Sequence, residues 1–516
     1  MLGGDAPRGK FRRFAPTPWT QESPEWQVLD QRLPHDHLAR RVVAAVEMLD
    51  LDPLFASYLG VGKKALRPDL LLSMVIYEMQ GKRASPAQWT RDARESEPLR
   101  WLLFGMEPSR ARLYDFRDRI APFLEEWNAQ VLQRAVEENL TPATRAALDG
   151  TSVAALASRR QLFNEERLQK RCDTIADALE QLCNGANLPD SPAWLAKTED
   201  GLRRQRRCYQ RAGEVLDERQ AANAERRSGK RKPADKVLVS ASDPEAVPAR
   251  DKENVFRPLY TVQLVRDLDS PLVFSYSVWT QNNDNGVLEP MVERMTDNVG
   301  RKPEVLLVDS GYVSIRHLEF CAQAGITLYG PCQENDYSVQ NRKKTQSNQH
   351  TELPKSAFRW LKEEQAYECP EGHRLGFTKE QTQQRAGYTI NLAIYTCPPE
   401  HCLGCRRQEA CTRTPQKGRS VSRMEGEDLL DALRARMATP EAKRLYKLRS
   451  QTVELNFADV KEHRGVRRFH CYGRSRATGE VGAVVLAHNM LCVASRLAAA
   501  RDAPSTTETT QPACAA

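Results

Sequence analysis

The sequence predicts an α/β protein whose sheet follows an all-helical N-terminal domain and precedes a second helical region. Five short apolar runs with strand character lie between residues 147 and 329. Apolar residues at helical spacing dominate residues 31–140 and the chain after Met424. With 516 residues and 40% hydrophobic content, the chain is long enough for several modules around a sizeable core.

The N-terminal region is expected to be flexible over residues 1–30 and helical over residues 31–140. From Val43 to Ala93, apolar helical segments alternate with Gly and Pro breaks. No run of about eighteen apolar residues occurs, and the first residues lack the apolar segment of a signal peptide. We therefore expect no membrane span and a cytoplasmic protein.

The expected strands cover residues 147–149, 260–267, 272–279, 305–309 and 326–329, and a short helix is expected over 286–295. Between the first two strands lies an insertion, roughly residues 157–236, with two helical stretches separated by PDSPAW. It is interpreted as a helical hairpin with a basic tip. Such a hairpin could clamp DNA or a second protomer, or could be a spacer packed on the core.

Three acidic residues stand in settings that suit a metal-dependent nuclease. Asp309 follows the apolar run VLLV and precedes a glycine turn, so it is placed at a strand's carboxyl end, where α/β sheets bind ligands. Asp149, in AALDGTS, has similar surroundings. Glu454 lies in a helical pattern from Glu441 to Arg464 without Gly or Pro.

Carboxylates are the hard oxygen ligands that Mg²⁺ prefers, and two such ions can assist phosphodiester transfer. Any one of these residues taken alone is more often a cap, a turn former or part of a solvated face. The formal net charge of +8 is modest, but basic residues concentrate at 203–232 and at 461–476, around the third acidic motif. That second concentration favours contact with DNA phosphates.

In their order and their amino-acid sequences, the three motifs resemble those of the bacterial insertion-sequence transposases of the DDE type. The resemblance rests on the Asp-Gly-Thr box at Asp149, the segment 239–263 with its DPEA, the VDSGY box, and the ending VKEHRGVRRF. In the most similar branch the third motif runs Tyr, Arg, Glu, Lys, matched here by Tyr446, Arg449, Glu454 and Lys461. Four residues separate Arg449 from Glu454 where three are usual. This spacing is expected to turn the arginine away from the glutamate's face and to put Ser450 there.

The resemblance implies an RNase H-like mixed sheet flanked by helices, with Asp149, Asp309 and Glu454 converging on two Mg²⁺ or Mn²⁺ ions. It implies double-stranded DNA as partner, both transposon ends and target, and a homodimer on that DNA. The expected DNA contacts are Tyr446, Arg449, Lys461, Arg464, Arg467 and Arg468. Asp243, in DPEA, is a secondary site candidate, for which a turn cap is an equal alternative.

Thirteen cysteines in a cytoplasmic chain argue for metal spacing rather than disulfides. Cys402 and Cys405 have the CxxC spacing that lets two thiolates hold one Zn²⁺. Related transposases carry a similar cysteine pattern, which implies Cys369, Cys402, Cys405 and Cys411 as ligands of a structural zinc, with Cys397 or His373 as alternates. Free buried thiols are the alternative.

The expected organisation is a catalytic core over 141–331, a loop and Cys-rich zinc-binding insertion over 332–423, the helical remainder of the core over 424–501, and a disordered tail over 502–516. Residues 31–140 would bind transposon ends or support assembly. No P-loop or GxGxxG occurs, so no nucleotide cofactor is expected. Two other functions are kept open: a domesticated DNA-binding protein that does not cut, and a metal-dependent nuclease without strand transfer.

Overall fold

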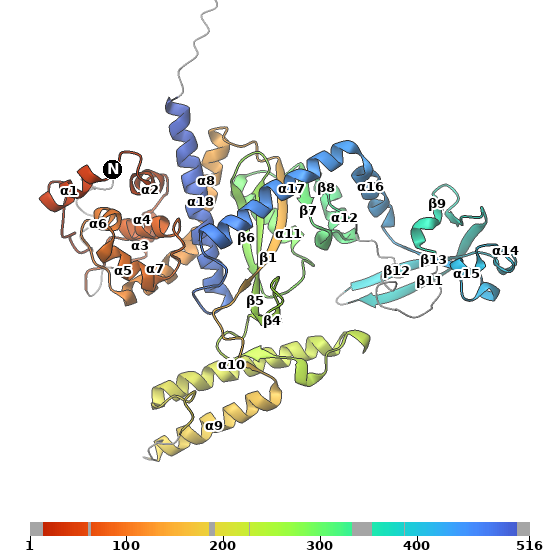
Figure 1. Cartoon of the computed structure of the whole chain (residues 1–516), viewed down its shortest axis with the longest axis horizontal. Coiled ribbons are helices and arrows are strands. Elements are labelled where there is room, and N and C mark those ends of the chain that lie inside the picture. Colours follow the sequence, from red (N-terminus) through yellow and green to blue (C-terminus); the bar gives the residue numbers. More distant parts are fainter. Residues whose placement is uncertain are drawn as a thin grey trace, which may run out of the picture.

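The computed structural model describes residues 14–59, 63–184, 191–226, 228–332, 353–385 and 388–502 (Figure 1). Almost all of the expected tail over 502–516 lies outside these residues. Residues 333–352 of the expected loop also lie outside them. The described chain is a mixed α/β protein. A central sheet is flanked by helices, and two smaller parts extend away from it.

The N-terminal region is a group of helices that packs beside the long helix α18 (Figure 1). Proline stands in the first turn of several of them, where its missing N–H costs no helical hydrogen bond. The helices are α1 (Pro24–Arg32), α2 (Leu38–Val46), α3 (Asp52–Ala56), α4 (Pro68–Glu78), α5 (Pro86–Glu95), α6 (Glu97–Leu102), α7 (Arg110–Ile120) and α8 (Leu124–Glu137). Helix α4 is apolar on almost every side and lies at the centre of the group.

The prediction of a flexible segment over residues 1–30 is wrong for residues 14–30. Phe14 is buried, and the Trp26 ring stacks on Trp101 and Phe104 with centroids 5.5 Å apart. The Trp26 indole also donates to the Trp101 carbonyl at 3.1 Å. Large aromatic side chains gain enough from burial to hold this polar, proline-rich stretch against the helices.

The central sheet contains all five expected strand segments and one short additional strand. Its order is β4-β5-β1-β7-β8, with β6 also paired to β5. β1 runs antiparallel to β5 and parallel to β7; β7 is parallel to β8, and β5 is antiparallel to β4 and β6. The strands are β1 (Arg145–Ala154), β4 (Val247–Arg250), β5 (Phe256–Asp267), β6 (Val273–Trp279), β7 (Val305–Val308) and β8 (Thr327–Tyr329).

Strand β1 is longer than expected, because it continues past Asp149 to Ala154. The β-branched residues Thr151 and Val153 extend the pairing with β5, which runs from Ala146 opposite Asp267 to Ala154 opposite Leu259. Asp149 therefore lies within a strand and not at its end.

The helices around the sheet are α11 (Leu288–Val299), α12 (Ile315–Gln323), α16 (Glu427–Ala438), α17 (Pro440–Ala458) and α18 (Arg474–Asp502). Helix α17 begins after Thr439, whose hydroxyl accepts from the Ala442 N–H, and passes into a π-helical turn over Asp459–His463. It contacts β1, β5 and β7. The carboxyl-terminal part of the chain thus crosses the strands that carry Asp149 and Asp309 (Figure 1).

Helix α18 is a core helix that packs on α8, β6, α2 and α4. Asn489 ties it to β6, because its side chain accepts from the Val273 N–H at 2.9 Å and donates to the Val273 carbonyl at 2.7 Å. Among the described residues it is the one helix long and apolar enough to cross a membrane, over Arg474–Ala499. Because 61% of its most apolar window is buried inside the protein, this is weak evidence for a membrane span.

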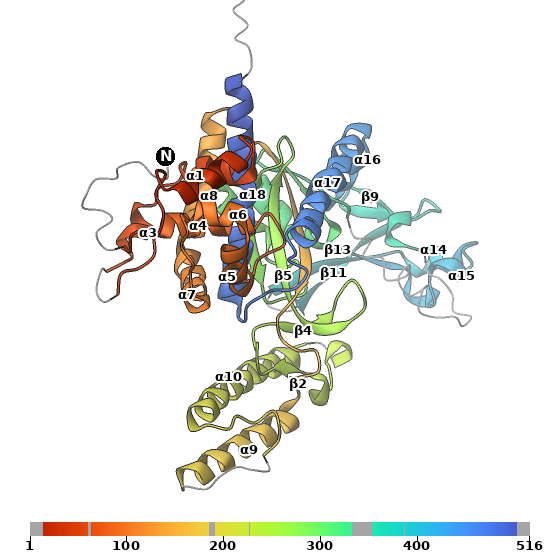
Figure 2. The same cartoon turned by 60° about the vertical axis from the view of Figure 1, so that its left-hand side comes forward.

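The insertion after β1 forms a helical hairpin, as its sequence pattern predicts. Helices α9 (Glu165–Cys183) and α10 (Glu199–Ala224) lie side by side and project from the sheet (Figures 1 and 2). The short strands β2 (Leu162–Phe163) and β3 (Val239–Ser240) pair at its base. Two small apolar clusters hold it together, one at this base and one between the helices.

The Cys-rich region is a separate antiparallel sheet in the order β13-β12-β11-β10-β9. Its elements are β9 (Arg359–Leu361), β10 (Ala366–Glu368), β11 (Arg374–Arg385), β12 (Tyr388–Thr396), α14 (Pro399–Cys402), α15 (Gln408–Cys411) and β13 (Ser420–Met424). It has its own core, which includes Phe358, Tyr367 and Tyr395. The sequence pattern predicted no strands here, so the sheet is a new finding.

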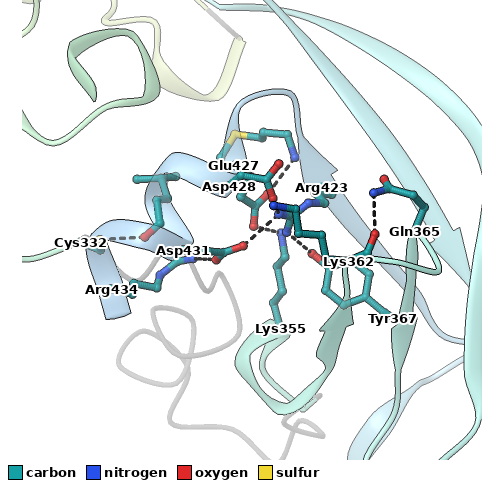
Figure 3. A network of polar contacts seen from close by, with 12 residues as sticks. Cys332, Lys355, Lys362, Gln365, Tyr367, Arg423, Glu427, Asp428, Asp431 and Arg434 are labelled. Carbon is teal, nitrogen blue, oxygen red and sulfur yellow. Dashed lines mark hydrogen bonds and ion pairs between the residues drawn. The ribbon is translucent and has the colours of Figure 1, made fainter. Parts of the chain in front are cut away.

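A charged network joins this second sheet to helix α16. Figure 3 shows Lys355, Arg423 and Glu427 pointing toward one another. Lys355 Nζ donates to the Ser422 carbonyl at 2.6 Å and forms an ion pair with Glu427. Arg423 pairs with Asp428 and, at 2.9 Å, with Asp431. Because α16 leads directly into α17, the network fixes the Cys-rich sheet to the polypeptide that carries Glu454.

Candidate active site

The sheet register places Asp149 and Asp309 side by side. Leu148 of β1 is paired with Val308 of β7, the last residue of that strand, and the two aspartates follow this pair directly. Asp309 leaves the sheet there and starts a tight turn in which its carboxylate accepts from the Ser310 N–H at 2.6 Å. The carboxylate of Asp149 accepts from the Gly150 N–H at 2.8 Å.

Helix α17 brings the third carboxylate to the same place. Tyr446, near its start, donates its hydroxyl to the Val308 carbonyl at 3.1 Å. Arg266 of β5 donates to the Thr452 carbonyl of α17 at 2.5 Å. These two contacts hold the helix across the sheet at β7 and β5, with Glu454 between the fixed points and the π-helical turn.

Arg449 connects all three carboxylates. Its Nη2 lies 2.8 Å from Asp149 Oδ2 and 4.0 Å from Asp309 Oδ2, and its Nη1 lies 3.9 Å from Glu454 Oε1. The Arg449 side chain is only 12% exposed and Asp149 17%, whereas Asp309 and Glu454 are 53% and 60% exposed. The site is thus closed beneath by Asp149 and open to solvent on the side of the other two carboxylates.

The expectation that Arg449 turns away from Glu454 is wrong. The four intervening residues do rotate the two Cα positions apart on the helix, but an arginine side chain is long enough to reach back across that angle. Three nearby negative charges draw the guanidinium to the centre. Ser450, expected at that place, is exposed and donates to the Lys447 carbonyl.

Burial is the main influence on the titration of Asp149. It raises the pKa of this carboxyl, while Arg449 and the Gly150 N–H act in the opposite direction and Asp309 adds to the rise. Burial also opposes the charge of Arg449, yet the neighbouring Asp149, Tyr446 and Asp309 raise its pKa. Arg449 therefore favours the ionised form of Asp149 against the effect of burial.

The donor chemistry of this site fits Mg²⁺ or Mn²⁺. All three side chains offer carboxylate oxygens, and the guanidinium already stands among them as a cation. Arg449 Nε is buried without a hydrogen-bond partner in the described part of the chain, so this arginine is incompletely bonded. As the side chains stand, no three His, Cys, Asp or Glu among the described residues form a ready metal centre. Arg449 separates the carboxylates that would do so.

Lys461 lies close to the site on the π-helical turn. Its Nζ donates to Thr151 Oγ1 at 2.6 Å and to the Ser152 carbonyl at 3.1 Å, both in β1 beyond Asp149. Burial, followed by the positive charges of Lys252 and Arg467, lowers the pKa of this ammonium group. The structure thus holds a desolvated cation beside the strand that carries the first aspartate.

Four arginines were expected to contact DNA; Arg449 lies among the three carboxylates, and two of the others make packing contacts within the protein. Arg464 is 7% exposed, and its guanidinium donates to Asp459 at 2.6 Å and to Gln80 Oε1 at 2.9 Å, which ties the π-helical turn to the N-terminal helices. Arg468 donates to the Ala155 carbonyl at 3.2 Å and to other carbonyls after β1. Arg467 is 59% exposed and pairs with Glu462 and Glu253. Sequence position alone could not separate these roles.

Asp243 is not among the carboxylates that Arg449 joins. It is buried and accepts from the Tyr260 hydroxyl at 2.6 Å, which ties the segment after β3 to β5. Burial raises the pKa of this carboxyl. The contacts support its alternative interpretation as a structural residue of the DPEA turn.

The five cysteines of the second sheet surround one small cavity of about 20 Å³. Its lining includes Cys369, Cys397, Cys402, Cys405 and Cys411, together with His401. The Arg407 N–H donates to Cys405 Sγ at 3.5 Å, and the His373 N–H donates to Cys369 Sγ at 3.4 Å. Burial and the nearby Cys402 thiol raise the pKa of Cys397 to about 12. Cys397 and Cys402 are buried and the other three cysteines are partly buried around the same cavity. Thiolates are the ligands that a soft cation such as Zn²⁺ prefers.

His401 was missed by sequence reasoning, although it directly precedes Cys402. Its ring stacks on that of His373 with centroids 4.4 Å apart, so the alternate ligand His373 lies just behind the cavity wall. Gln263 and Asp284 were also missed. They lie behind Asp149 and Asp309, and no local sequence pattern marks them.

A comparison with known protein families finds a similarity over part of the chain. Residues 368–493 match the family described as the transposase DDE domain. The match joins the Cys-rich sheet from Glu368 onward, Glu454 and most of α18 in one family segment, and it does not extend to Asp149 or Asp309. No curated protein and no solved structure matches the chain.

Proposed function

We propose that this chain is an insertion-sequence transposase that cuts DNA at transposon ends and joins the freed 3' hydroxyl to target DNA. The observation that carries the proposal is the contact of Arg449 with Asp149, Asp309 and Glu454, which brings three carboxylates from distant parts of the sequence to one place. The transposase DDE domain match supports it, because that segment contains Glu454.

The sheet supports an RNase H-like core. Strand β5 runs antiparallel to both of its neighbours β6 and β1, and β7 and β8 continue the sheet in parallel with β1. The site lies where β1 and β7 separate. Asp149 and Asp309 would hold two Mg²⁺ or Mn²⁺ ions, and Glu454 would complete the donor set. The ions would supply stabilisation of the charge that develops on the attacking and leaving oxygens.

The residues of the chain orient the DNA and balance its charge. Water attacks the phosphodiester at the transposon end and breaks its bond to the 3' oxygen, which leaves a 3' hydroxyl and a 5' phosphate. The 3' hydroxyl then attacks a target phosphodiester, and the target's own 3' oxygen leaves as a hydroxyl. Lys461, held by Thr151, neutralises a phosphate beside Asp149. Arg467 is exposed, so among Arg464, Arg467 and Arg468 it is the remaining candidate for a contact with the DNA backbone.

Two further assignments complete the proposal. The cysteines around the 20 Å³ cavity hold a structural zinc that stabilises the second sheet. Residues 31–140 contact transposon ends or support assembly, and two copies of the chain act together because two DNA ends are handled at once.

The test is a cleavage and joining assay on labelled DNA with the ends that flank the gene. Cleavage in Mg²⁺, its loss in EDTA and the appearance of joined product are expected. Nicking without joined product would indicate a metal-dependent nuclease that lacks strand transfer. Tight binding without any cleavage would indicate a domesticated DNA-binding protein.

A further inference from the structure

A hydrogen-bonded network of three side chains lies directly behind Asp149 and Asp309. Gln263 is fully buried in β5, and its Nε2 donates to Asp284 Oδ1 at 3.0 Å. The hydroxyl of Tyr312 donates to Gln263 Oε1. Tyr312 is 1% exposed and ends the tight turn that Asp309 begins. This hydrogen-bonded network thus joins strand β5, the segment before α11, and the turn after β7.

Both aspartate motifs have a glycine at the point where this network approaches the backbone. Gly150 is paired with Gln263 across β1 and β5, and a Cβ at Gly150 would lie 2.5 Å from Gln263 Nε2. A Cβ at Gly311 would lie 2.6 Å from Asp284 Oδ2. Each distance is too short for a side chain. A Cβ at either glycine would therefore displace the same hydrogen-bonded group, which approaches the backbone beside each aspartate.

The hydrogen bonds fix the orientation of the Gln263 amide. Its NH₂ faces a carboxylate and its carbonyl oxygen faces a hydroxyl, so each end has the partner that its chemistry requires. A buried amide satisfied on both sides is rigid, since any rotation leaves polar atoms unpaired in a region of low dielectric. The position of the turn after β7 is thereby coupled to β5 and, through Gly150, to β1.

We propose that Gln263, Asp284 and Tyr312 are positioning residues that set the separation of the Asp149 and Asp309 carboxylates for metal binding. The inference rests on the proposed metal site and adds to it. None of the three needs to touch DNA or the reacting atoms. They act by fixing the position of Gly150 relative to the turn that begins at Asp309. In other proteins, residues that surround the metal ligands orient those ligands in a similar way.

The experiment measures the affinity of the whole chain for Mn²⁺ by calorimetry, without DNA, together with the midpoint of thermal unfolding. Tyr312→Phe removes one hydroxyl and keeps the ring. Gln263→Met keeps the side-chain length and removes both hydrogen bonds. The matched control is Tyr276→Phe, which removes a hydroxyl from a buried tyrosine of β6. Asp149→Asn identifies the binding event that belongs to the site.

Tyr312→Phe and Gln263→Met are expected to weaken Mn²⁺ binding by on the order of tenfold. The control should bind Mn²⁺ like the wild type, and its unfolding midpoint should fall by a similar amount to that of Tyr312→Phe. Unchanged Mn²⁺ affinity in both positioning variants, with binding lost in Asp149→Asn, would overturn the positioning role and leave the metal site intact. If Asp149→Asn binds Mn²⁺ like the wild type, the proposed metal site is wrong, and the positioning role, which depends on that site, is wrong too.

Discussion

The guanidinium of Arg449 lies 2.8 Å from the carboxylate of Asp149 and so links helix α17 to the central strand of the sheet. The two residues are far apart in the sequence, and the link also brings Glu454 within reach of the same cation. This arginine stands among three carboxylates that would otherwise repel one another. The contact leads directly to the first prediction.

Replacing Arg449 by Gln should strengthen metal binding. The guanidinium places a positive charge within 4.0 Å of all three carboxylates, and its repulsion of a divalent cation there is worth on the order of 1 kcal/mol or more. Mn²⁺ affinity, measured by calorimetry, should rise by about tenfold. Arg444→Gln, an exposed position on the same helix, is the control and should change nothing. Weaker Mn²⁺ binding in the Arg449 variant would mean that the arginine organises the site rather than competing with the ion.

The N-terminal helices should become less stable as the pH rises from about 4.5 to 8. Burial raises the pKa of Glu78 from 4.5 to about 8, so across this window the unfolded chain gives up a proton that the folded chain retains. Glu78→Gln removes the cost of burying the charge. At pH 8 the variant should be more stable than the wild type by about 1–3 kcal/mol in the free energy of unfolding, and so should unfold at a higher temperature. At pH 4.5 the two should unfold at nearly the same temperature. Glu107→Gln, at an exposed position, should show no such pH dependence. An equal effect of Glu78→Gln at both pH values would contradict the assigned pKa.

The Cys-rich sheet should contain bound zinc. Metal analysis of the purified chain is expected to give about one zinc per molecule, because closed sulfur-rich sites hold the ion tightly. Cys402→Ser should lose the zinc and lower the unfolding temperature of this sheet. Cys208→Ser alters an exposed cysteine on α10 and should retain the metal. A full zinc content in Cys402→Ser would show that the cavity does not bind the ion through this thiolate.

Arg464 and Arg467 should behave differently although they lie three positions apart. Arg464→Ala removes a buried cation from its pair with Asp459 and should destabilise the protein by about 3 kcal/mol. Arg467→Ala should leave stability unchanged and reduce the salt dependence of DNA binding by about one phosphate contact. Denaturation curves and binding titrations at several salt concentrations separate the two effects. The assignment would be wrong if Arg467→Ala destabilised the chain and Arg464→Ala did not.

The sequence predicts the parts of the site that depend on local pattern. The VLLV run before Asp309 and the glycine after it specify a buried strand followed by a turn, and Ser314 caps the next helix as its residue type suggests. The sequence pattern correctly places Asp149 in a strand, but it predicts that the strand ends at Asp149, whereas β1 continues to Ala154. The continuation through Thr151 and Val153 depends on pairing with β5, which is a tertiary interaction.

Other features could not be read from the chain, because they depend on side-chain reach or on distant partners. The return of Arg449 to Glu454 follows from the charges of two aspartates that lie outside α17. Asp284 stands in a stretch of Asn, Asp and Gly typical of a turn, and its contact with Gln263 appears only in the folded protein. Strand β11 is largely polar over TKEQTQQR, so its pattern resembles a loop until β12 supplies hydrogen-bond partners.

The central claim is that Asp149, Asp309 and Glu454 form one metal-dependent site for phosphodiester transfer. The most direct measurement is the rate of Mg²⁺-dependent cleavage of labelled end DNA by Asp309→Asn, with Asp297→Asn on the exposed side of α11 as the matched control. Loss of one carboxylate that would hold the metal ions predicts a fall of at least about a hundredfold, with DNA binding retained and the control active. Cleavage by Asp309→Asn at a rate within a few-fold of the wild type would contradict the account.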